Sequence, residues 1–149
     1  MSEPGQPPPE PGPRDRGVLD TSTVILLQRL KDDAALPAEP LITAVTLAEL
    51  SVGPLIVDDE RERAVRQAHL QQAESDFHPL PFDADAARAF GRVAASLRRA
   101  GRKASARAYD AMIAATAIAN DLPLYTCNPA DFAGIDELTV VEVPVPEAG

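Results

Sequence analysis

The sequence predicts one α/β domain with a mainly parallel central sheet flanked by helices. Short apolar segments of strand character are centred near residues 18, 42, 79, 124 and 140, and helical patterns separate most of them. This alternation favours parallel strands, because each helix carries the chain back to the end of the sheet at which the previous strand began. With 149 residues, the chain suits a single domain with one core.

Both ends of the chain lack the features of a folded domain. Residues 1–16 are rich in proline and contain no large apolar residue after Met1, so they are expected to form a disordered tail. The folded domain is expected over residues 17–143, followed by a frayed end at residues 144–149. All candidate site residues lie within the expected domain.

Charge and composition exclude several classes of protein. The net charge of −9 argues against nucleic-acid binding through overall charge, so any such binding needs a local basic patch. The single cysteine, Cys127, rules out an internal disulfide and a cysteine-caged zinc ion. His69 and His78 have no second histidine or cysteine at ligand spacing and are interpreted as structural or surface residues. The longest apolar run is too short to span a membrane and the N-terminal residues have no apolar signal core, so a cytoplasmic protein is expected.

Asp20 ends the first predicted strand and precedes a helix with apolar residues at helical spacing up to Leu30. In open α/β sheets, ligands bind at the carboxyl ends of the strands, where the hydroxyls of Thr21 and Ser22 could orient metal-bound water or phosphate oxygens. The structural alternative is helix capping, because an acid before a helix often accepts hydrogen bonds from its first amides.

Glu49 lies near the second predicted strand-to-helix junction, after a strand expected over residues 41–44. Thr46 and Glu49 have the spacing of a capping box, in which each side chain accepts a hydrogen bond from the amide of the other residue. Capping alone would explain this glutamate, although the junction repeats the arrangement seen at Asp20. Residues 58–75 then form a highly charged helix that is expected to face solvent.

The middle of the chain combines a weak strand with a basic segment. Residues 77–82 are predicted as a short strand at an edge of the sheet, because Pro79 and Pro81 cannot donate ladder hydrogen bonds. The stretch from residue 88 to residue 107 carries no acid and these basic residues: Arg88, Arg92, Arg98, Arg99, Arg102, Lys103 and Arg107. Several of them crowd around a predicted turn at Gly101, where a solvated surface and a phosphate-binding rim are both possible interpretations.

Asp110 directly precedes the most apolar helix of the chain. Thr116 is the only polar side chain from residue 111 to residue 119, which predicts a helix buried on all sides. If Ser105 is the N-cap, Asp110 lies about one turn inside the helix and cannot cap it. An aspartate in that position needs a cation.

A fourth acid follows the next predicted strand. Residues 122–127 read as a short buried strand, and Asn128 with the proline after it breaks that strand. Asp131 lies three residues further on, and a last strand is expected over residues 138–143. The carboxyl end of the sheet thus gains another acid and an amide.

The four acids are predicted to share one end of the sheet: Asp20, Glu49, Asp110 and Asp131. Like charges a few ångströms apart raise each other's pKa and destabilise the fold unless a cation neutralises them. Oxygen ligands without histidine or cysteine select Mg²⁺ or Mn²⁺. A water polarised by such an ion can attack a phosphodiester phosphorus in line with the leaving oxygen.

Four motifs, in this order, resemble those of a PIN domain of the VapC toxin type: L-D-T-S, T-L-A-E-L, D-A-M-I-A-A-T-A and T-C-N-P-A-D-F. The resemblance covers residues 17–143 and implies a three-layer fold and a metal-dependent endoribonuclease, the toxin of a toxin–antitoxin pair. It also implies Mg²⁺ as cofactor, with Mn²⁺ as a substitute, an RNA substrate, a homodimer and inhibition by a small VapB-like antitoxin. The proline-rich tail departs from the family, whose members usually begin almost at the first strand.

The resemblance assigns roles to individual residues. By motif position, Asp20, Glu49 and Asp110 match the three core acids of the family, and Asp131 matches a more variable fourth. The polar residues that match their supports are Thr21, Ser22 and Asn128. The basic residues interpreted as the RNA-binding rim are Arg98, Arg99, Arg102, Lys103 and Arg107.

Three alternatives to the nuclease make different demands on the sequence. A phosphatase with an aspartyl nucleophile at Asp20 usually has a second acid two residues later, where this chain has Ser22. A catalytically silent PIN-like module that binds RNA or a protein partner would tolerate the loss of an acid, yet all four acids are present. A purely structural domain would have no need of Asp110.

Overall fold

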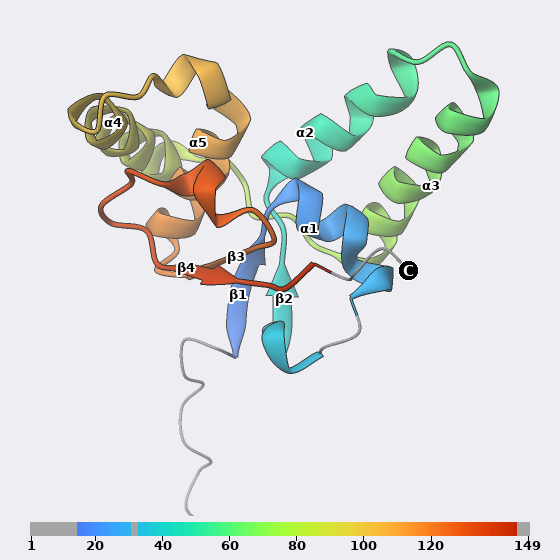
Figure 1. Ribbon diagram of the computed structural model, residues 1–149, viewed down its shortest axis with the longest axis horizontal. Coiled ribbons are helices and arrows are strands. Elements are labelled where there is room, and N and C mark those ends of the chain that lie inside the picture. The colour runs from blue at the N-terminus through green and yellow to red at the C-terminus, as the bar shows by residue number, and fades with distance from the viewer. Residues whose placement is uncertain (1–14, 31–32, 146–149) are drawn as a thin grey trace, which may run out of the picture.

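The computed structural model describes residues 15–30 and 33–145 (Figure 1). Its centre is a four-stranded sheet in the order β2-β1-β3-β4, and every pair of neighbouring strands is parallel. The strands are β1 (Arg16–Leu19), β2 (Glu39–Leu41), β3 (Leu124–Thr126) and β4 (Val140–Glu142). The predicted α/β architecture with a parallel sheet is confirmed.

Two pairs of helices form arms on either side of the space above the sheet (Figure 1). The helices are α1 (Thr21–Leu26), α2 (Ala44–Val52), α3 (Glu60–Asp76), α4 (Ala84–Arg99) and α5 (Ala108–Ala119). Helices α2 and α3 make one arm, and α4 and α5 make the other. Within the described residues, no helix is both long and apolar enough to cross a membrane.

Both faces of the sheet are covered, as the sequence predicted. Val18 and Leu124 pack into the cluster formed with α4 and α5, whereas Leu19 and Tyr125 pack into a second cluster that includes residues of α1. Consecutive residues of a strand point to opposite faces, so two adjacent residues on each strand serve two separate cores. The result is a three-layer domain, with helix α5 as the best-buried element of one outer layer.

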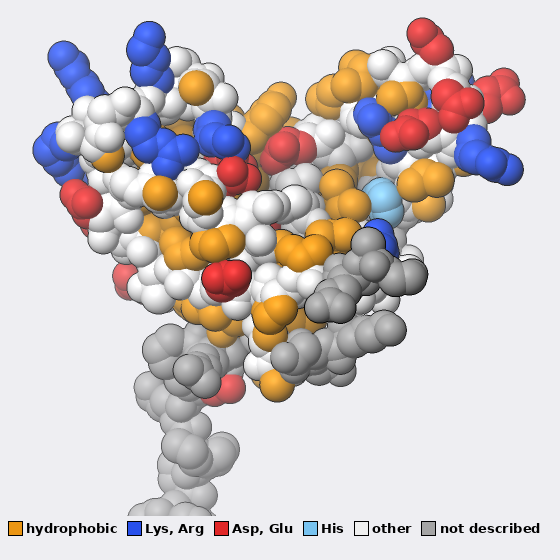
Figure 2. Space-filling model, in the orientation of Figure 1, with side chains coloured by type: hydrophobic (Ala, Val, Ile, Leu, Met, Phe, Trp, Pro, Cys, Tyr) orange, Lys and Arg blue, Asp and Glu red, His pale blue; other side chains and the backbone are white. Residues whose placement is uncertain are grey.

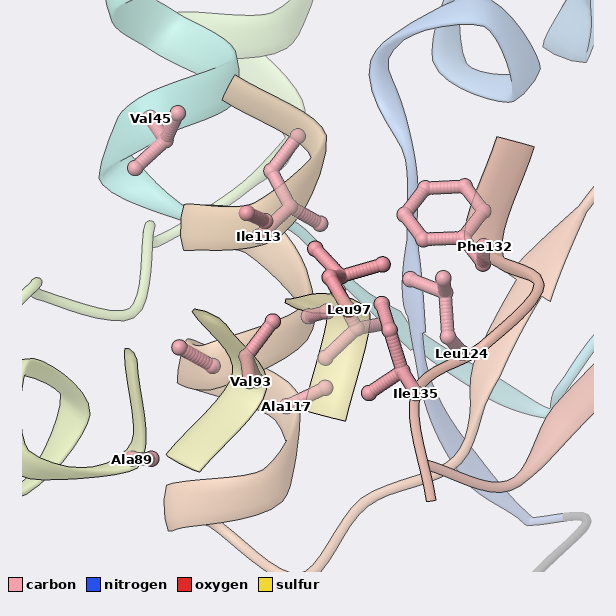
Figure 3. Packing of buried hydrophobic residues seen from close by; sticks show 13 residues of the cluster. Val45, Ala89, Val93, Leu97, Ile113, Ala117, Leu124, Phe132 and Ile135 are labelled. Carbon is pink, nitrogen blue, oxygen red and sulfur yellow. The ribbon is translucent and has the colours of Figure 1, made fainter. Parts of the chain in front are cut away.

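Helix α5 is buried as its sequence indicated. Ile113 and Ala117 are fully buried, and they pack with Val93 and Leu97 of α4 (Figure 3). The one polar side chain of the buried run, Thr116, is also fully buried, and its hydroxyl donates a hydrogen bond of 2.8 Å to the Met112 carbonyl. Helix α5 therefore forms a rigid floor from which its first turn can present Asp110.

The strand predicted over residues 77–82 is absent. Only Leu80 pairs with the sheet, through an isolated parallel bridge to Thr43. Its N–H donates to the Ile42 carbonyl at 2.9 Å, and its carbonyl accepts from the Ala44 N–H at 2.8 Å. Prolines flank Leu80 and have no N–H to donate, so the expected brief edge pairing stops at a single residue.

Several predicted boundaries shift by a few residues. The second strand ends at Leu41 rather than at residue 44, and the first helix ends at Leu26 and continues as a 3₁₀ turn over Leu27–Arg29. Strand β1 starts at Arg16, one residue before the expected domain start, and the Asp15 carbonyl accepts a hydrogen bond from the Glu39 N–H at 2.6 Å. Most of the predicted disordered tail, residues 1–14, and most of the predicted frayed end, residues 146–149, lie outside the described residues.

Candidate active site

The four predicted acids come from separate parts of the chain and converge beside the ends of β1 and β3. Asp20 directly follows β1, Glu49 lies within α2, and Asp110 lies in the first turn of α5. Asp131 lies in a 3₁₀ turn, η5 (Pro129–Phe132), which follows β3. Figure 2 shows acidic side chains at the base of the hollow between the two arms.

Asp20 is almost completely buried, with 3% of its surface exposed. Its Oδ1 accepts hydrogen bonds from the hydroxyl and, at 3.2 Å, from the backbone N–H of Thr23, and its Oδ2 accepts from the hydroxyls of Ser22 at 3.2 Å and Thr126 at 2.9 Å. The bond from the Thr23 amide makes Asp20 the N-cap of α1, so the capping interpretation is confirmed. No basic side chain among residues 15–30 and 33–145 forms an ion pair with this carboxylate.

The capping box predicted for Glu49 is wrong. Helix α2 begins at Ala44, and its N-cap is Thr43, whose hydroxyl accepts from the Thr46 N–H at 3.2 Å. Glu49 therefore lies in the second turn, out of reach of the free amides. Its Oε1 instead accepts a hydrogen bond of 2.6 Å from the hydroxyl of Thr21, at the start of α1. Helix capping does not explain Glu49, whose carboxylate is held toward the end of β1.

The cation that Asp110 requires is an arginine of the same chain. Helix α5 begins at Ala108, and residues 104–107 form a 3₁₀ turn, so the expectation that Ser105 caps the helix is wrong. Nη1 of Arg107 lies 3.6 Å from Oδ2 of Asp110 and 2.9 Å from Oδ1 of Asp131. One guanidinium group thus bridges two of the four acids and offsets their repulsion.

The acids lie close enough to perturb one another. Burial raises the pKa of the Glu49 carboxyl; the hydrogen bond from Thr21 opposes this rise, and the charges of Asp110 and Asp20 add to it. Burial also raises the pKa of Asp110, and the charges of Asp131 and Asp20 add to the rise while Arg107 opposes it. The four carboxylates therefore form one electrostatic cluster that favours the uptake of a proton or a cation.

The donor chemistry of this cluster fits a hard divalent ion. Its side chains offer oxygen donors and no histidine or thiolate, which suits Mg²⁺ or Mn²⁺ rather than zinc. Within the described part of the chain, no three histidine, cysteine, aspartate or glutamate side chains lie close enough together to form a ready-made cage. Mg²⁺ is usually held by one or two carboxylates and keeps several waters, so two of these acids are a sufficient donor set.

Comparison with known proteins identifies the family. A family model described as PIN domain matches residues 18–138. Ribonuclease VapC5 of Mycobacterium tuberculosis is 41% identical over 129 residues, which cover 85% of this chain and 93% of that protein. The chain belongs to the VapC family of PIN domains.

Two further comparisons agree. Ribonuclease VapC of Rickettsia bellii is 31% identical to this PIN domain over 131 residues, covering 86% of this chain and 96% of that protein. The crystal structure of VapBC-5 from M. tuberculosis, described as a member of the VapBC family of toxin–antitoxin systems, matches with a TM-score of 0.74 and 38% identity, covering 87% of this chain and 99% of the matched chain. The predicted PIN-like fold and the predicted family are confirmed.

The polar residues around Asp20 link the ends of β1 and β3 in this PIN domain. The Ser22 hydroxyl, which donates to Asp20, also accepts from Nδ2 of Asn128 at 3.2 Å. The Asn128 N–H donates to the hydroxyl of Thr126 at 2.9 Å, and Thr126 donates in turn to Asp20. Ser22 and Asn128 thus occupy the supporting positions expected of them. Thr126 and Thr23 were not singled out from the sequence.

The hydroxyl of Thr46 is a further support that the sequence did not reveal. It lies 3.0 Å from the hydroxyl of Thr21 and is fully buried. Because Thr21 donates its proton to Glu49, Thr46 is the donor in this contact. The chain of hydroxyls from Thr46 through Thr21 orients the Glu49 carboxylate.

The predicted basic rim divides into paired and unpaired cations. Arg107 contacts the acids, Arg99 pairs with an exposed aspartate of the loop before β4 at 3.1 Å, and Arg102 donates to two backbone carbonyls after β3 at 2.8 and 3.3 Å. Arg98 and Lys103 have no ion-pair partner among the described residues. Basic side chains gather over the α4–α5 arm in Figure 2. Within the described part of the chain, only these two of the five predicted RNA contacts have a charge without an internal partner.

An apolar groove of about 460 Å³ adjoins the acids on the α2–α3 arm. Thr21 and Glu49 line it together with apolar residues such as Ile25, Val52 and Val65. A neighbouring hollow of about 440 Å³ between α1 and α3 shares part of this lining. Exposed apolar side chains continue to the tip of the arm at Leu55 and Ile56, which are 83% and 69% exposed. Such a contiguous exposed apolar surface is typical of a protein-binding site.

Proposed function

We propose that this PIN domain is a metal-dependent endoribonuclease, the toxin of a toxin–antitoxin pair. The observation that carries the proposal is the convergence of Asp20, Glu49 and Asp110 on one electrostatic cluster whose donor chemistry suits Mg²⁺ or Mn²⁺. The ribonuclease names of the VapC relatives support RNA as the substrate. A bound divalent ion would supply a polarised water and neutralise charge that develops at the phosphodiester.

The acids and the hydroxyls of the site would have different roles in the reaction. Asp20, Glu49 and Asp110 would hold the ion, directly or through its waters, and the hydroxyls around Asp20 would keep its carboxylate in a fixed orientation. Thr21 would hold Glu49 in place through its 2.6 Å hydrogen bond. Fixed ligand orientation matters because a small displacement of a catalytic group lowers the rate strongly.

Arg107 would serve both the empty and the occupied site. Its guanidinium group offsets the repulsion between Asp110 and Asp131. If Asp110 held an ion, this carboxylate would no longer need the charge of Arg107, and the 2.9 Å contact with Asp131 would keep Arg107 in position. A guanidinium group has five N–H donors, so Arg107 could contact Asp131 and a phosphate oxygen of the RNA at the same time.

The apolar groove would accept the antitoxin. The structural relative from M. tuberculosis is a VapBC complex, which supports a VapB-like partner for this chain. An amphipathic helix could bury its apolar face against Ile25, Val52 and Val65. Because Glu49 and Thr21 line the same groove, an occupant would block access to the acids. We also propose that the protein is a homodimer in the cytoplasm, which sedimentation of the purified protein and fractionation of cells would test.

RNA cleavage tests the proposed activity. Wild-type protein with Mg²⁺ and a 5′-labelled single-stranded RNA should produce internal fragments, whereas a chelator should abolish them. Asp20→Asn should lower the rate by about 100-fold or more while the protein stays folded, because asparagine is also a good N-cap but carries no charge. Glu74→Gln, which removes an exposed carboxylate of α3, is the matched control and should cleave as the wild type does.

The same assay separates the alternatives. A phosphatase would hydrolyse a phosphate monoester such as p-nitrophenyl phosphate, which we expect to remain intact. RNA that is bound by the wild type and remains uncut with both Mg²⁺ and Mn²⁺ would identify a catalytically silent RNA-binding module instead. Full activity of Asp20→Asn would remove this acid from the reaction.

A further inference from the structure

A second pocket, separate from the apolar groove, opens beside the acids on the α4–α5 arm. Its volume is about 360 Å³, and Asp110 and Asp131 form part of its lining. It shares no lining residue with the groove or with the hollow next to it. Whatever occupies this pocket would therefore lie next to the proposed cleavage site and would not overlap the proposed antitoxin site.

The lining of the pocket is apolar on one side and cationic at the rim. Leu97, Ala111 and Ile135 supply the apolar wall, and each is buried. Arg102 and Lys103 supply cations, together with Arg107. An apolar wall with a few placed charges is the usual character of a small-ligand site. Here the charges would suit a phosphate, and the wall would suit a ribose or a base.

Among the described residues, Lys103 is the lining cation whose side chain has no internal partner. Arg102 donates to the carbonyls of Ala130 and Ala133, and Arg107 is held by Asp131. Lys103 is exposed and forms no ion pair within residues 15–30 and 33–145. A lysine ammonium carries three donors and a full charge, and phosphate is a common partner for such a group.

The turn before Lys103 gives this residue a defined position. Helix α4 ends in a Schellman motif: the Gly101 N–H donates to the Arg98 carbonyl at 3.0 Å, and the Arg102 N–H donates to the Leu97 carbonyl at 2.8 Å. Gly101 has a φ of 78°, a conformation that favours glycine. The backbone that carries Lys103 is thus fixed to the end of α4 and to the pocket wall at Leu97.

We propose that this pocket binds the nucleotide next to the scissile phosphate of an RNA strand, with Lys103 as its phosphate contact. The inference rests on the proposed nuclease function, since it is the cleavage site at the acids that makes a neighbouring nucleotide available. Among the described residues that line the pocket none is aromatic, so the base would meet apolar atoms rather than a stacking ring. The subsite would position the strand and have little preference for any base.

Binding measurements without catalysis test the subsite. The anisotropy of a fluorescent single-stranded RNA is measured with full-length protein in a chelator over a series of salt concentrations. Lys103→Ala should weaken binding about tenfold and lower the slope of log K against log salt by about one, as expected for one lost phosphate contact. Arg61→Ala is the matched control, because it removes an exposed charge of helix α3 on the other arm, which forms no ion pair within the described residues and does not line the pocket. It should change the affinity less than about threefold.

A pair of neutral variants tests the cavity itself. Ala106→Leu adds bulk to the lining without changing charge, and Ser105→Leu adds a side chain to the same exposed turn outside the lining. Ala106→Leu alone should weaken RNA binding. Equal effects of Lys103→Ala and Arg61→Ala, or of the two leucine variants, would overturn the subsite and leave only a nonspecific effect of charge or bulk.

Competition identifies the ligand class and separates the two proposals. A nucleoside monophosphate should displace the labelled RNA at a concentration at which inorganic phosphate does not, and equal competition by the two would overturn the nucleotide assignment. If the wild type binds RNA through Lys103 but cleaves none with Mg²⁺ or Mn²⁺, the proposed function fails and the pocket remains a nucleotide site without a scissile phosphate. If the protein cleaves RNA and Lys103→Ala binds RNA as tightly as the wild type, the proposed function stands and the subsite fails.

Discussion

Replacement of Glu49 with glutamine separates the charge of this side chain from its hydrogen bond. A glutamine carbonyl oxygen can still accept the proton of Thr21, which donates to Glu49 at 2.6 Å. The fold disfavours the charge, because burial and the charges of Asp110 and Asp20 raise the pKa of the carboxyl. In the absence of metal, Glu49→Gln should therefore be at least as stable as the wild type at neutral pH.

The pH dependence gives the sign of this effect. A carboxyl whose pKa is raised in the folded protein favours folding at low pH, and that contribution is lost as the pH rises through the folded pKa. For Glu49, the loss begins above its ordinary pKa of 4.5. The wild type and Glu49→Gln should have the same melting temperature at about pH 4. As the pH increases toward neutrality, the melting temperature of the variant should rise above that of the wild type.

A bound metal ion should reverse the order of stability of the wild type and Glu49→Gln. An ion that binds only the folded state stabilises it by about 2.7 kcal/mol at a hundredfold excess over its Kd. At roughly 4 °C per kcal/mol for a domain of this size, the wild type should melt about 10 °C higher in Mn²⁺ than in chelator. Glu49→Gln should lose most of this shift, because its amide oxygen is a much weaker ligand for a hard cation.

Thermal melting with and without Mn²⁺ at two pH values measures both effects. Glu74→Gln, an exposed glutamate of α3, controls for the loss of one negative charge and should keep the full metal shift. A Glu49→Gln protein that retains the wild-type shift would refute the assignment of Glu49 to the metal. A variant that is destabilised in chelator by several kcal/mol would show that the charge supports the fold, contrary to the raised pKa.

Three further predictions concern a buried hydroxyl, the arginine between two acids, and the N-terminal segment. Ser96→Ala should lower the free energy of unfolding by about 2 kcal/mol in chemical denaturation, because the buried hydroxyl donates to the Gly134 carbonyl at 2.6 Å and accepts from the Asp136 N–H at 2.9 Å. Ser75→Ala, which removes an exposed hydroxyl of α3, is the control, and a Ser96→Ala protein as stable as the wild type would refute the reasoning. Arg107→Gln should lower the melting temperature of the metal-free protein at neutral pH and increase the stabilisation by Mn²⁺, because the two acids that Arg107 bridges lose their counter-charge. An unchanged melting temperature with and without Mn²⁺ would show that these ion pairs do not contribute to stability. Deletion of residues 1–14 should leave melting and RNA cleavage intact, because they add no large apolar residue after Met1, and a lower melting temperature would show that they pack on the domain.

Local patterns were sufficient for four of the five predicted strands and for the placement of three acids. Asp20 was predicted between a strand and a helix, and Asp110 at the start of an apolar helix. Both predictions needed only the pattern of apolar and polar side chains over a few consecutive residues. The same local logic failed at Glu49. A capping box and a mid-helix glutamate can share one spacing. Helix α2 starts at Ala44, directly after Thr43, which bridges to Leu80 far away in the chain, and a local pattern does not contain that contact.

The supports of the site depend on long-range pairing and could not be predicted. Thr126 reaches Asp20 only because β3 pairs with β1 in the register that places Tyr125 opposite Leu19. The bond from Thr46 to Thr21 likewise joins two helices that follow different strands. Single-sequence patterns carry no information on which strand lies beside which, so these hydroxyls had no recognisable signature.

The basic segment shows the same limit for charged residues. Its run of cations was evident from the sequence, but the loops that pair with Arg99 and Arg102 follow β3, about thirty residues later in the chain. These contacts divide the basic patch into residues that are held by the fold and residues whose charge is free to bind a ligand. Within the described residues, Lys103 forms neither the ion pair seen at Arg99 nor the carbonyl hydrogen bonds seen at Arg102, and only the folded structure could show this difference.

Anomalous diffraction from crystals grown with Mn²⁺ tests the central claim most directly. A single Mn²⁺ has enough anomalous signal to be located without assumptions about its ligands. The ion should lie at about 2.0–2.3 Å from a carboxylate oxygen of Asp110 and from one of Asp20 or Glu49, and the peak should vanish in Asp110→Asn crystals. A peak bound elsewhere in the protein, with none at these acids in a crystal that cleaves RNA when dissolved, would contradict the assignment of the metal-dependent reaction to this cluster.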